Sequence, residues 1–389
     1  MTPQRQVLQN HTLVVRDGRI LDIAPSAAAR QRYESTALVQ RPAHLLMPGM
    51  INAQTHAAMS LDPERSSGPE DARDGCLAGI AEMLQSGITC FGDRSRVPGE
   101  TARSAAEQGM RAVVGLAVAD GPSPSLKVRD DYRGHPLIST AFAPRAPNAV
   151  SDETFARIAA LADELDAGII VDLHRSAAEI DESMVRYGRR PIERLWHAGL
   201  LTPATNAVHM VHLSGADIDL AQRTGIAVSL CPQADLKQGA GAAPAVALVA
   251  SGMRVGIGSG GAERQNQDVW GEMKLLALLS RIGPAPLGAW DALTLATRGG
   301  AAALGLDAEV GTLEIGKWAD LCCVDLGGPA MHPVNDPVEQ LVFCGGREMV
   351  SDVWVAGRQL LSEGEMTRLD WPGVAARANA RAERLKTGG

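Results

Sequence analysis

The strongest constraint on the fold is an alternation through the middle of the chain, in which short apolar runs take turns with helical stretches. The apolar runs are residues 45–51, 89–92, 111–115, 138–142, 168–172, 206–209, 227–230 and 254–258. The helical stretches are residues 71–86, 100–108, 151–167, 183–199, 215–224 and 242–251. Strands that alternate with helices form a parallel sheet, and eight such strands close a (β/α)8 barrel. The expected fold class is therefore α/β, with a (β/α)8 TIM barrel over residues 48–309.

The two ends of the chain carry a different pattern, that of β-hairpins. The strand-like segments are residues 12–24, 317–325 and 350–361. Asp17-Gly18 is a tight-turn pair inside the first segment, and Gly357 marks a turn inside the last. Because chain ends are often close in space, we expect one small composite β-sandwich domain from residues 1–47 plus 310–370. Residues 371–389 are expected to form a C-terminal helix or tail.

Net charge, apolar runs and cysteine spacing indicate which kind of partner to expect. A formal net charge of -8 argues against nucleic acid or an anionic membrane as the main partner, since both select for basic patches. No apolar run approaches the ~18–20 residues of a membrane-spanning helix, and no apolar signal core follows the N-terminus. The six cysteines lack CxxC spacing, which favours buried free thiols in a cytoplasmic protein. We therefore expect a cytoplasmic protein whose partner is a small molecule.

Polar residues follow the apolar runs, where a parallel barrel places its active site. Gln54 and His56 lie two apart after the first run, so on a strand they project from the same face. Two histidines at this spacing would supply half of a metal site, but glutamine is a poor ligand for a transition metal. Other polar or glycine residues at the strand ends are Arg145, Asp172, His174, Arg175, His209, His212 and Gly260.

Several longer segments match one known family. They are residues 16–20, 47–53, 55–59, 134–138, 143–154, 271–273, 292–297, 311–321 and 352–357. In this order they resemble the amidohydrolase superfamily, and most closely its methylthioadenosine/S-adenosylhomocysteine deaminase and triazine-hydrolase (Trz/Atz) branch. The resemblance covers nearly the whole chain. It implies a TIM barrel with a composite β domain, a homodimer, one divalent metal (usually zinc or iron), and hydrolysis of carbon–nitrogen bonds other than peptide bonds.

The metal ligands implied by the resemblance are largely replaced. Relatives use two histidines on the first strand, one on the fifth and an aspartate on the eighth. Here Gln54 replaces the first histidine and His56 keeps the second. Asp172 falls on the fifth-strand histidine, and Gly260, within Gly258-Ser259-Gly260-Gly261, falls on the aspartate.

Three further positions complete the alignment with the relatives' site. Arg175 falls on the catalytic glutamate, and Arg145 falls on a histidine of the relatives. His209 matches their sixth-strand histidine. Arginine stays protonated and cannot shuttle protons, glycine has no side chain to bind metal, and a fixed positive charge disfavours a dication. The sequence therefore predicts a degenerate metal site with no cofactor.

Asp172 and Arg175 suggest what organises such a site. One hypothesis is that they pair with each other and that the guanidinium replaces the metal. The alternative is that Arg175 points into solvent.

Three functional interpretations follow, and they differ on whether the chain is an enzyme. The first is a metal-free pseudoenzyme, a non-deaminating homologue that binds a purine-, pterin- or triazine-like ligand. Its ligand-binding residues would be Gln54, His56, Arg145, Asp172, His174, Arg175, His209 and Gly260. The second is an active hydrolase with a site rebuilt from His56, Asp172, His174 and His209. The third is a structural or regulatory partner of an active paralogue.

The second interpretation carries its own assignments. Zinc or iron would be held by His56, Asp172 and His209, and the catalytic candidates are His174, His209 and Arg175. Arg145 and Arg175 would bind an anionic substrate if the chemistry needs no metal.

Overall fold

A parallel β-barrel forms the centre of the structure, a computed structural model that describes residues 5–61, 69–121, 126–260 and 266–387. Its eight-stranded sheet has the order β11-β10-β9-β8-β7-β6-β5-β4, so neighbours in the sheet are also neighbours along the chain. The strands are β4 (Met50–Thr55), β5 (Ile88–Asp93), β6 (Arg111–Val118), β7 (Ile138–Pro144), β8 (Gly168–Leu173), β9 (Thr205–His209), β10 (Ala227–Leu230) and β11 (Arg254–Ile257). The predicted (β/α)8 fold class is confirmed.

The barrel closes where β4 meets the end of β11. The backbone N–H of Gly260 donates to the carbonyl of Gln54 at 3.0 Å, and that of Ser259 donates to Oδ1 of Asn52 at 2.9 Å. Asn52 Nδ2 in turn donates to Ser259 Oγ at 2.9 Å. A Cβ atom on Gly258 would stand 2.6 Å from the Gln54 nitrogen, so only glycine permits this close approach.

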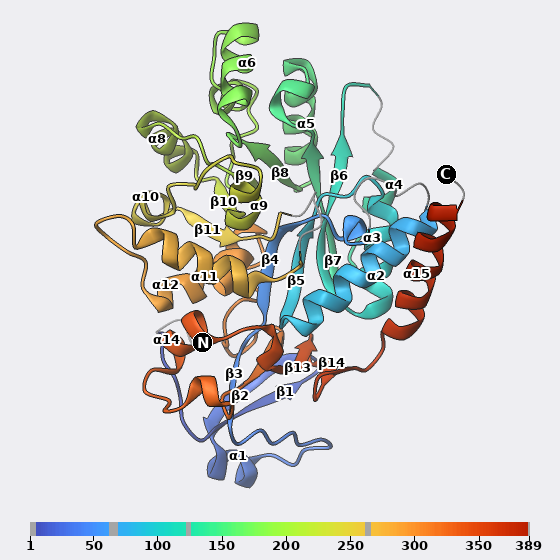
Figure 1. Cartoon of the computed structure of the whole chain (residues 1–389), viewed down its shortest axis with the longest axis vertical. Helices are drawn as coiled ribbons and strands as arrows, with labels where there is room; N and C mark the ends of the chain where they lie inside the picture. The colour runs from blue at the N-terminus through green and yellow to red at the C-terminus, as the bar shows by residue number, and fades with distance from the viewer. Residues whose placement is uncertain (1–4, 62–68, 122–125, 261–265, 388–389) are drawn as a thin grey trace.

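Helices surround the barrel (Figure 1). They are α2 (Pro69–Gln85), α3 (Pro98–Gln108), α4 (Leu126–Asp131), α5 (Asp152–Glu164), α6 (Ala177–Tyr187), α7 (Pro191–His197), α8 (Gly215–Thr224), α9 (Pro232–Lys237), α10 (Ala245–Ala250), α11 (Val269–Ser280), α12 (Ala289–Thr294) and α13 (Gly300–Ala303). The helix predicted over 215–224 is confirmed. The one predicted over 183–199 is two helices, because Gly188 ends α6 in a left-handed conformation and Pro191 begins α7.

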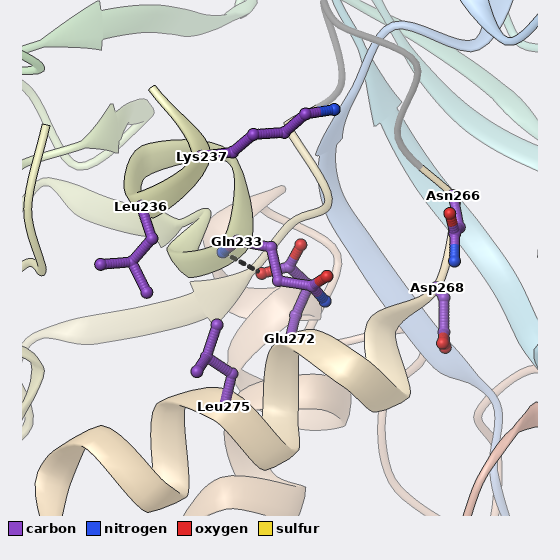
Figure 2. A pocket seen from close by; sticks show the side chains of 7 residues that line it. All are labelled: Gln233, Leu236, Lys237, Asn266, Asp268, Glu272 and Leu275. Carbon is purple, nitrogen blue, oxygen red and sulfur yellow. Dashed lines mark hydrogen bonds between the residues drawn. The ribbon is translucent and has the colours of Figure 1, made fainter. Parts of the chain in front are cut away.

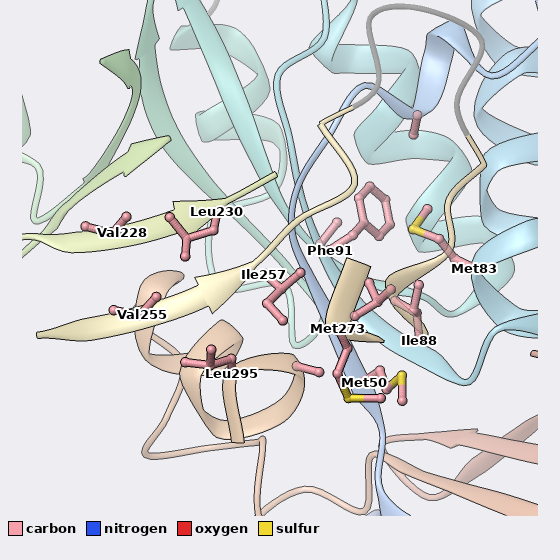
Figure 3. Close-up of a cluster of buried hydrophobic side chains, with 14 of the residues drawn as sticks. Met50, Met83, Ile88, Phe91, Val228, Leu230, Val255, Ile257, Met273 and Leu295 are labelled. Atoms are coloured by element: carbon pink, nitrogen blue, oxygen red, sulfur yellow. The ribbon is translucent and has the colours of Figure 1, made fainter. Parts of the chain in front are cut away.

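The main core lies between the barrel strands and these helices. Aliphatic side chains dominate it, as the 3% aromatic content requires. Figure 3 shows part of this core, where Met50 of β4, Ile257 of β11 and Met273 of α11 gather. A smaller apolar cluster includes Val113 and Val208, on strands β6 and β9. The packed helices thereby hold the strand ends that carry the polar residues.

A second, antiparallel sheet combines both ends of the chain. Its order is β15-β14-β13-β12-β3, so one N-terminal strand joins four C-terminal ones. The strands are β3 (His44–Pro48), β12 (Leu321–Asp325), β13 (Val350–Val355), β14 (Arg358–Ser362) and β15 (Glu365–Met366), and a separate hairpin pairs β1 (His11–Arg16) with β2 (Arg19–Pro25). This confirms the expected composite β region, which lies below the barrel in Figure 1. The proposed domain boundaries at 47, 310 and 370 stay predictions.

Three further helices flank these sheets and the barrel. They are α1 (Ser26–Arg32), α14 (Pro337–Cys344) and α15 (Trp371–Thr387). Helix α15 runs beside α2 in Figure 1, and Arg377 pairs there with Asp74 at 2.7 Å.

Two simpler expectations concern membranes and thiols. Over the described ranges, we find no helix with the length and apolar character needed to cross a bilayer. Five of the cysteines are buried free thiols as expected, but Cys344 is exposed at the end of α14.

A buried ion pair joins the barrel to the composite β region. Arg111, at the start of β6, donates to both carboxylate oxygens of Asp320, at 2.8 and 3.0 Å. Both residues are buried, and Asp320 Oδ1 also accepts from the backbone N–H of Ala356 at 2.8 Å. Truncating one partner would leave the other as an uncompensated buried charge.

We predict that Arg111→Met lowers the free energy of unfolding by about 3–5 kcal/mol, the cost of breaking a buried pair from one side. Arg103→Met is the matched control, because Arg103 pairs with Glu107 on the exposed face of α3 and its loss should leave stability nearly unchanged. Urea unfolding of both variants measures the difference. Equal losses would show that the Arg111 pair does not join the two parts.

Candidate functional site

Four side chains from different strand ends meet in what we call the mouth cluster, which comprises His56, Arg94, Asp172 and His209 together with Asp235 behind them. His56 follows β4, Arg94 follows β5, Asp172 lies in β8 and His209 ends β9. The Arg94 guanidinium forms an ion pair with Asp172. Nε2 of His209 lies 3.7 Å from Oδ1 of the same Asp172 carboxylate. Asp172 is thus the hub of the cluster.

His209 lies between two carboxylates. Its Nδ1 lies 2.6 Å from Oδ1 of Asp235, on α9, while its Nε2 faces Asp172. Both His209 and Asp235 are buried. Since a carboxylate can only accept, Nδ1 carries a proton, and the ring orientation is fixed with Nε2 turned toward the centre of the cluster.

His56 is oriented by the backbone of its neighbour. Its Nδ1 lies 2.6 Å from the carbonyl oxygen of Arg94, so Nδ1 donates and Nε2 is left free. Burial and then the positive charge of Arg94 lower the pKa of His56 to about 4. At neutral pH its ring is uncharged and offers a lone pair.

Asp172 is held ionised by its surroundings. Burial alone would raise the pKa of this carboxyl, but the Arg94 guanidinium beside it outweighs that effect and holds the pKa well below its usual range. The second guanidinium nitrogen of Arg94, Nη2, donates to the carbonyl of Pro144 at 3.2 Å. Arg94 and Asp172 retain 10% and 20% side-chain exposure, so the pair borders the barrel mouth and is not sealed in the core.

The structure places three other predicted residues around this centre without direct contact to it. Gln54 is buried, and its Oε1 has no hydrogen-bond partner among the described residues. Gly260 has a left-handed φ of 70°, and a Cβ on it would stand 2.8 Å from that of Ala234. Arg145 is exposed after β7. Gly261, part of the predicted glycine segment, lies outside the described residues.

The predicted pairing of Asp172 with Arg175 is wrong. The guanidinium of Arg175 donates to Gln238, just after α9, and its backbone N–H donates to Glu179 at 3.1 Å. Strand β8 ends at Leu173 and the next residue takes a left-handed φ of 54°, so the chain turns away before Arg175. Arg94, which follows β5 on another part of the barrel, pairs with Asp172 instead.

His174 does not join the mouth cluster, although the two-residue spacing suggested that it shares a face with Asp172. Its Nδ1 contacts the carbonyl of His212 at 3.1 Å, and its Nε2 accepts from the backbone N–H of Ile192 at 3.2 Å. The ring is fully buried between β8 and α7, where both nitrogens are satisfied by backbone groups. The predicted set of four ligands therefore meets only as His56, Asp172 and His209.

Two members of the cluster, Arg94 and Asp235, were not among the predicted site residues. Each had a sequence signal. One residue, Asp93, separates Arg94 from the apolar run 89–92, so Arg94 lies at the end of the predicted strand. Asp235 lies one helical turn after Pro232, on the helix that follows β10.

Two pockets lie along α9, the helix that carries Asp235. The first, of about 330 Å³, is lined by residues of α9 and α11, including Gln233 and Glu272 (Figure 2). Glu272 accepts from the backbone N–H of Gln233 at 2.9 Å, and burial raises the pKa of its carboxyl well above the usual range. The second, of about 370 Å³, is largely apolar and is lined in part by Asp235. Both volumes suit small organic ligands.

Residues 45–360 match the Amidohydrolase family. The chain belongs to this family. It is 36% identical to a 5-methylthioadenosine/S-adenosylhomocysteine deaminase of Teredinibacter turnerae, over 99% of this chain and 95% of the relative. It is 34% identical to the corresponding deaminase of Saccharophagus degradans, over 97% and 93%.

Two solved structures share the fold. An adenosine deaminase from Xanthomonas campestris with bound zinc superposes with a TM-score of 0.95 and 35% identity, covering 98% of this chain and 95% of that one. An atrazine chlorohydrolase from Arthrobacter aurescens complexed with zinc has a TM-score of 0.87 at 22% identity, covering 97% and 96%, and shares the fold.

Both of these similar structures contain zinc, so the residues of this chain can be examined for their ability to bind the same metal. Gln54 is an amide and Gly260 has no side chain, so neither supplies a transition-metal ligand of the usual kind. The Asp172 carboxylate is already paired with the Arg94 cation. Across the described ranges, no three His, Cys, Asp or Glu side chains are arranged to hold a metal ion. In this arrangement the residues do not fit a divalent metal.

We predict that His174 makes stability depend on pH. Burial lowers the pKa of His174 to about 4, against an ordinary value near 6.5, so the unfolded chain binds this proton first as pH falls. The stabilisation is fully present above about pH 6.5 and decreases as pH falls toward 4, by about 3 kcal/mol at most. Urea unfolding at a series of pH values measures it.

His174→Gln should make this part of the pH profile less steep, with the remainder due to His56, whereas His197→Gln, at an exposed position on α7, should leave it unchanged. An equally steep profile in His174→Gln would contradict the assignment.

Proposed function

We propose that this amidohydrolase-family protein binds a small heteroaromatic molecule at the barrel mouth, holds no resident metal and does not deaminate its ligand. The observation that carries the proposal is the ion pair between Arg94 and Asp172. It fills with a fixed cation the place where hydrolytic relatives need a metal and its activated water.

Electrostatics supports the absence of a metal. A dication placed about 4 Å from a guanidinium at an effective dielectric constant of about 20 meets a repulsion of about 8 kcal/mol. Metal binding would also have to break the Arg94–Asp172 pair. The ligand positions at Gln54 and Gly260 offer nothing to offset these costs.

The chain also lacks the residue that transfers protons when relatives deaminate their substrates. The resemblance aligns Arg175 with the catalytic glutamate, and an arginine cannot take a proton from water or deliver one to a leaving amine. In addition, Arg175 is engaged by Gln238, away from the cluster. Deamination therefore has neither its metal nor its acid–base residue.

The ligand class follows from the relatives. Relatives 35–36% identical to this chain are named for methylthioadenosine, S-adenosylhomocysteine and adenosine, and a structure 22% identical to it for atrazine. A purine-, pterin- or triazine-like ring is therefore the proposed ligand. The partly exposed Arg94 and Asp172 can hydrogen-bond its edge, and the neighbouring pockets provide space for its substituents.

A second candidate function is metal-independent hydrolysis of a carbon–nitrogen bond. The contact of 2.6 Å between His209 Nδ1 and Asp235 favours it, because an aspartate that orients a histidine is a common arrangement in general-base catalysis. In this version His209 is the base, and His174 has no role because its ring is buried elsewhere. The homodimer, the role as partner of a paralogue and the cytoplasmic location rest on the sequence alone and stay predictions.

The proposal is tested with the wild-type protein. Elemental analysis should find zinc and iron each below about 0.1 per chain, against about 1 for an occupied site. Adenosine, methylthioadenosine and S-adenosylhomocysteine should remain unchanged on prolonged incubation. At least one ring compound of a purine, pterin and triazine panel should raise Tm by roughly 2–5 °C.

Asp172→Ala should abolish the Tm shift, while Asp181→Ala, which removes an exposed aspartate of α6, should retain it. Release of ammonia by metal-free wild-type protein would favour the second candidate. Ammonia release that depends on stoichiometric zinc or iron would overturn both.

A further inference from the structure

We infer that Arg94 is the resident cation of a metal site whose supporting hydrogen bonds are intact, and that its guanidinium, more than the replaced ligands, excludes a divalent metal. The inference rests on the proposed absence of a metal from the wild-type protein. It adds that His56, Asp172 and His209 form a latent zinc site.

The first support is the orientation of both histidines. A metal-bound histidine usually donates its second ring N–H to a carboxylate or a backbone carbonyl, which fixes the ring and raises its basicity. His209 has this contact with Asp235 at 2.6 Å, and His56 has it with the carbonyl of Arg94 at 2.6 Å. In both rings Nδ1 is engaged in this way, so Nε2 is the free atom.

The second support is the spacing of the donors. Two ligand atoms bound tetrahedrally to zinc lie roughly 3.3 Å apart, given bonds of about 2.0–2.1 Å. His209 Nε2 and Asp172 Oδ1 are separated by 3.7 Å, a spacing that small rotamer changes would close. His56 lies beside them, since its Nδ1 is 2.6 Å from the carbonyl oxygen of Arg94, the residue whose side chain pairs with Asp172.

The third support is the place of the guanidinium itself. Arg94 follows β5, and its guanidinium pairs with the same Asp172 oxygen, Oδ1, that His209 Nε2 faces at 3.7 Å, while its backbone carbonyl contacts His56. Three protein ligands and a water suffice for zinc in catalytic sites, so replacement of Gln54 and Gly260 does not by itself abolish binding. Without the guanidinium, Asp172 would be a buried carboxylate in need of a cation.

The test is to remove the guanidinium and keep everything else. Arg94→Met keeps the aliphatic stem and the backbone carbonyl that orients His56. Arg94→Gln is a second neutral variant, whose amide can still donate to Asp172 if the methionine variant folds poorly. Arg94→Lys retains a cation, and Arg175→Met removes a neighbouring arginine outside the cluster.

Each protein is incubated with zinc, desalted and analysed for metal, and its Tm is measured with and without a chelator. We expect Arg94→Met or Arg94→Gln to hold about one zinc per chain, a roughly tenfold rise over wild type, with a Tm that falls on chelation. Arg94→Lys and Arg175→Met should stay metal-free. The double variant Arg94→Met/Asp172→Asn, which removes a donor and the unpaired charge together, should fold and bind no zinc.

The outcomes separate this inference from the proposed function. If wild type is metal-free and neither neutral variant takes up zinc, the role assigned to Arg94 is overturned while the proposed function stands. If wild type itself holds about one zinc per chain, both are overturned. If Arg175→Met loads zinc as well as Arg94→Met does, the exclusion is a general charge effect and the inference is again overturned.

Discussion

The approach of β4 to β11 is the constraint on which the rest of the molecule depends. These strands are about two hundred residues apart in sequence, and the barrel exists only if they meet. Gly258 permits the approach, and the side chains of Asn52 and Ser259 hydrogen-bond across the join. The same closure places His56, at the end of the first strand, beside residues that follow the other strands. The arrangement of charges at the mouth is therefore a consequence of how the barrel is closed.

The mouth cluster combines charges of both signs in a small, largely buried volume. Arg94 and the two carboxylates around His209 compensate one another along a chain from Arg94 through Asp172 and His209 to Asp235. Removing ions from water is costly, and a buried group of this kind persists only when each member has a partner of good geometry. In the proposed function, this mutual compensation takes over the organising role that a metal has in zinc-bound members of the family.

The sequence was sufficient for the fold and only partly sufficient for the site. Alternating patterns identified all eight strands, and α8 was predicted to the residue, because periodicity and burial are local properties. The break at Gly188 and Pro191 was missed, although both residues are helix-terminating types. At the site, the structure brings His56, Asp172 and His209 together, and their proposed role stays a prediction. Arg175 and His174 were misplaced because one left-handed residue after β8 changes the direction of everything that follows it.

Arg94 was missed for a related reason. Arg94 lies just after the apolar run 89–92, but no motif around it indicates a site residue. Which arginine reaches a given aspartate depends on strand order and side-chain length, and neither can be read from a single linear motif. Asp235 shows the same difficulty, since its contact with His209 joins a helix to a strand and the two residues lie 26 positions apart.

The conformation of Gly260 has a consequence for how easily this protein could change its chemistry. Hydrolytic relatives are implied to carry an aspartate at this position, but here the backbone has a left-handed φ of 70° and the space for a Cβ is already taken by Ala234. A single substitution to aspartate would add strain and a clash before it added a metal ligand. Reversion along that route would require at least one accompanying change, at Ala234 or in the adjacent backbone. Arg94 itself has no left-handed φ, so if its guanidinium excludes metal as we infer, the shortest mutational path to a metal-dependent activity begins at that arginine.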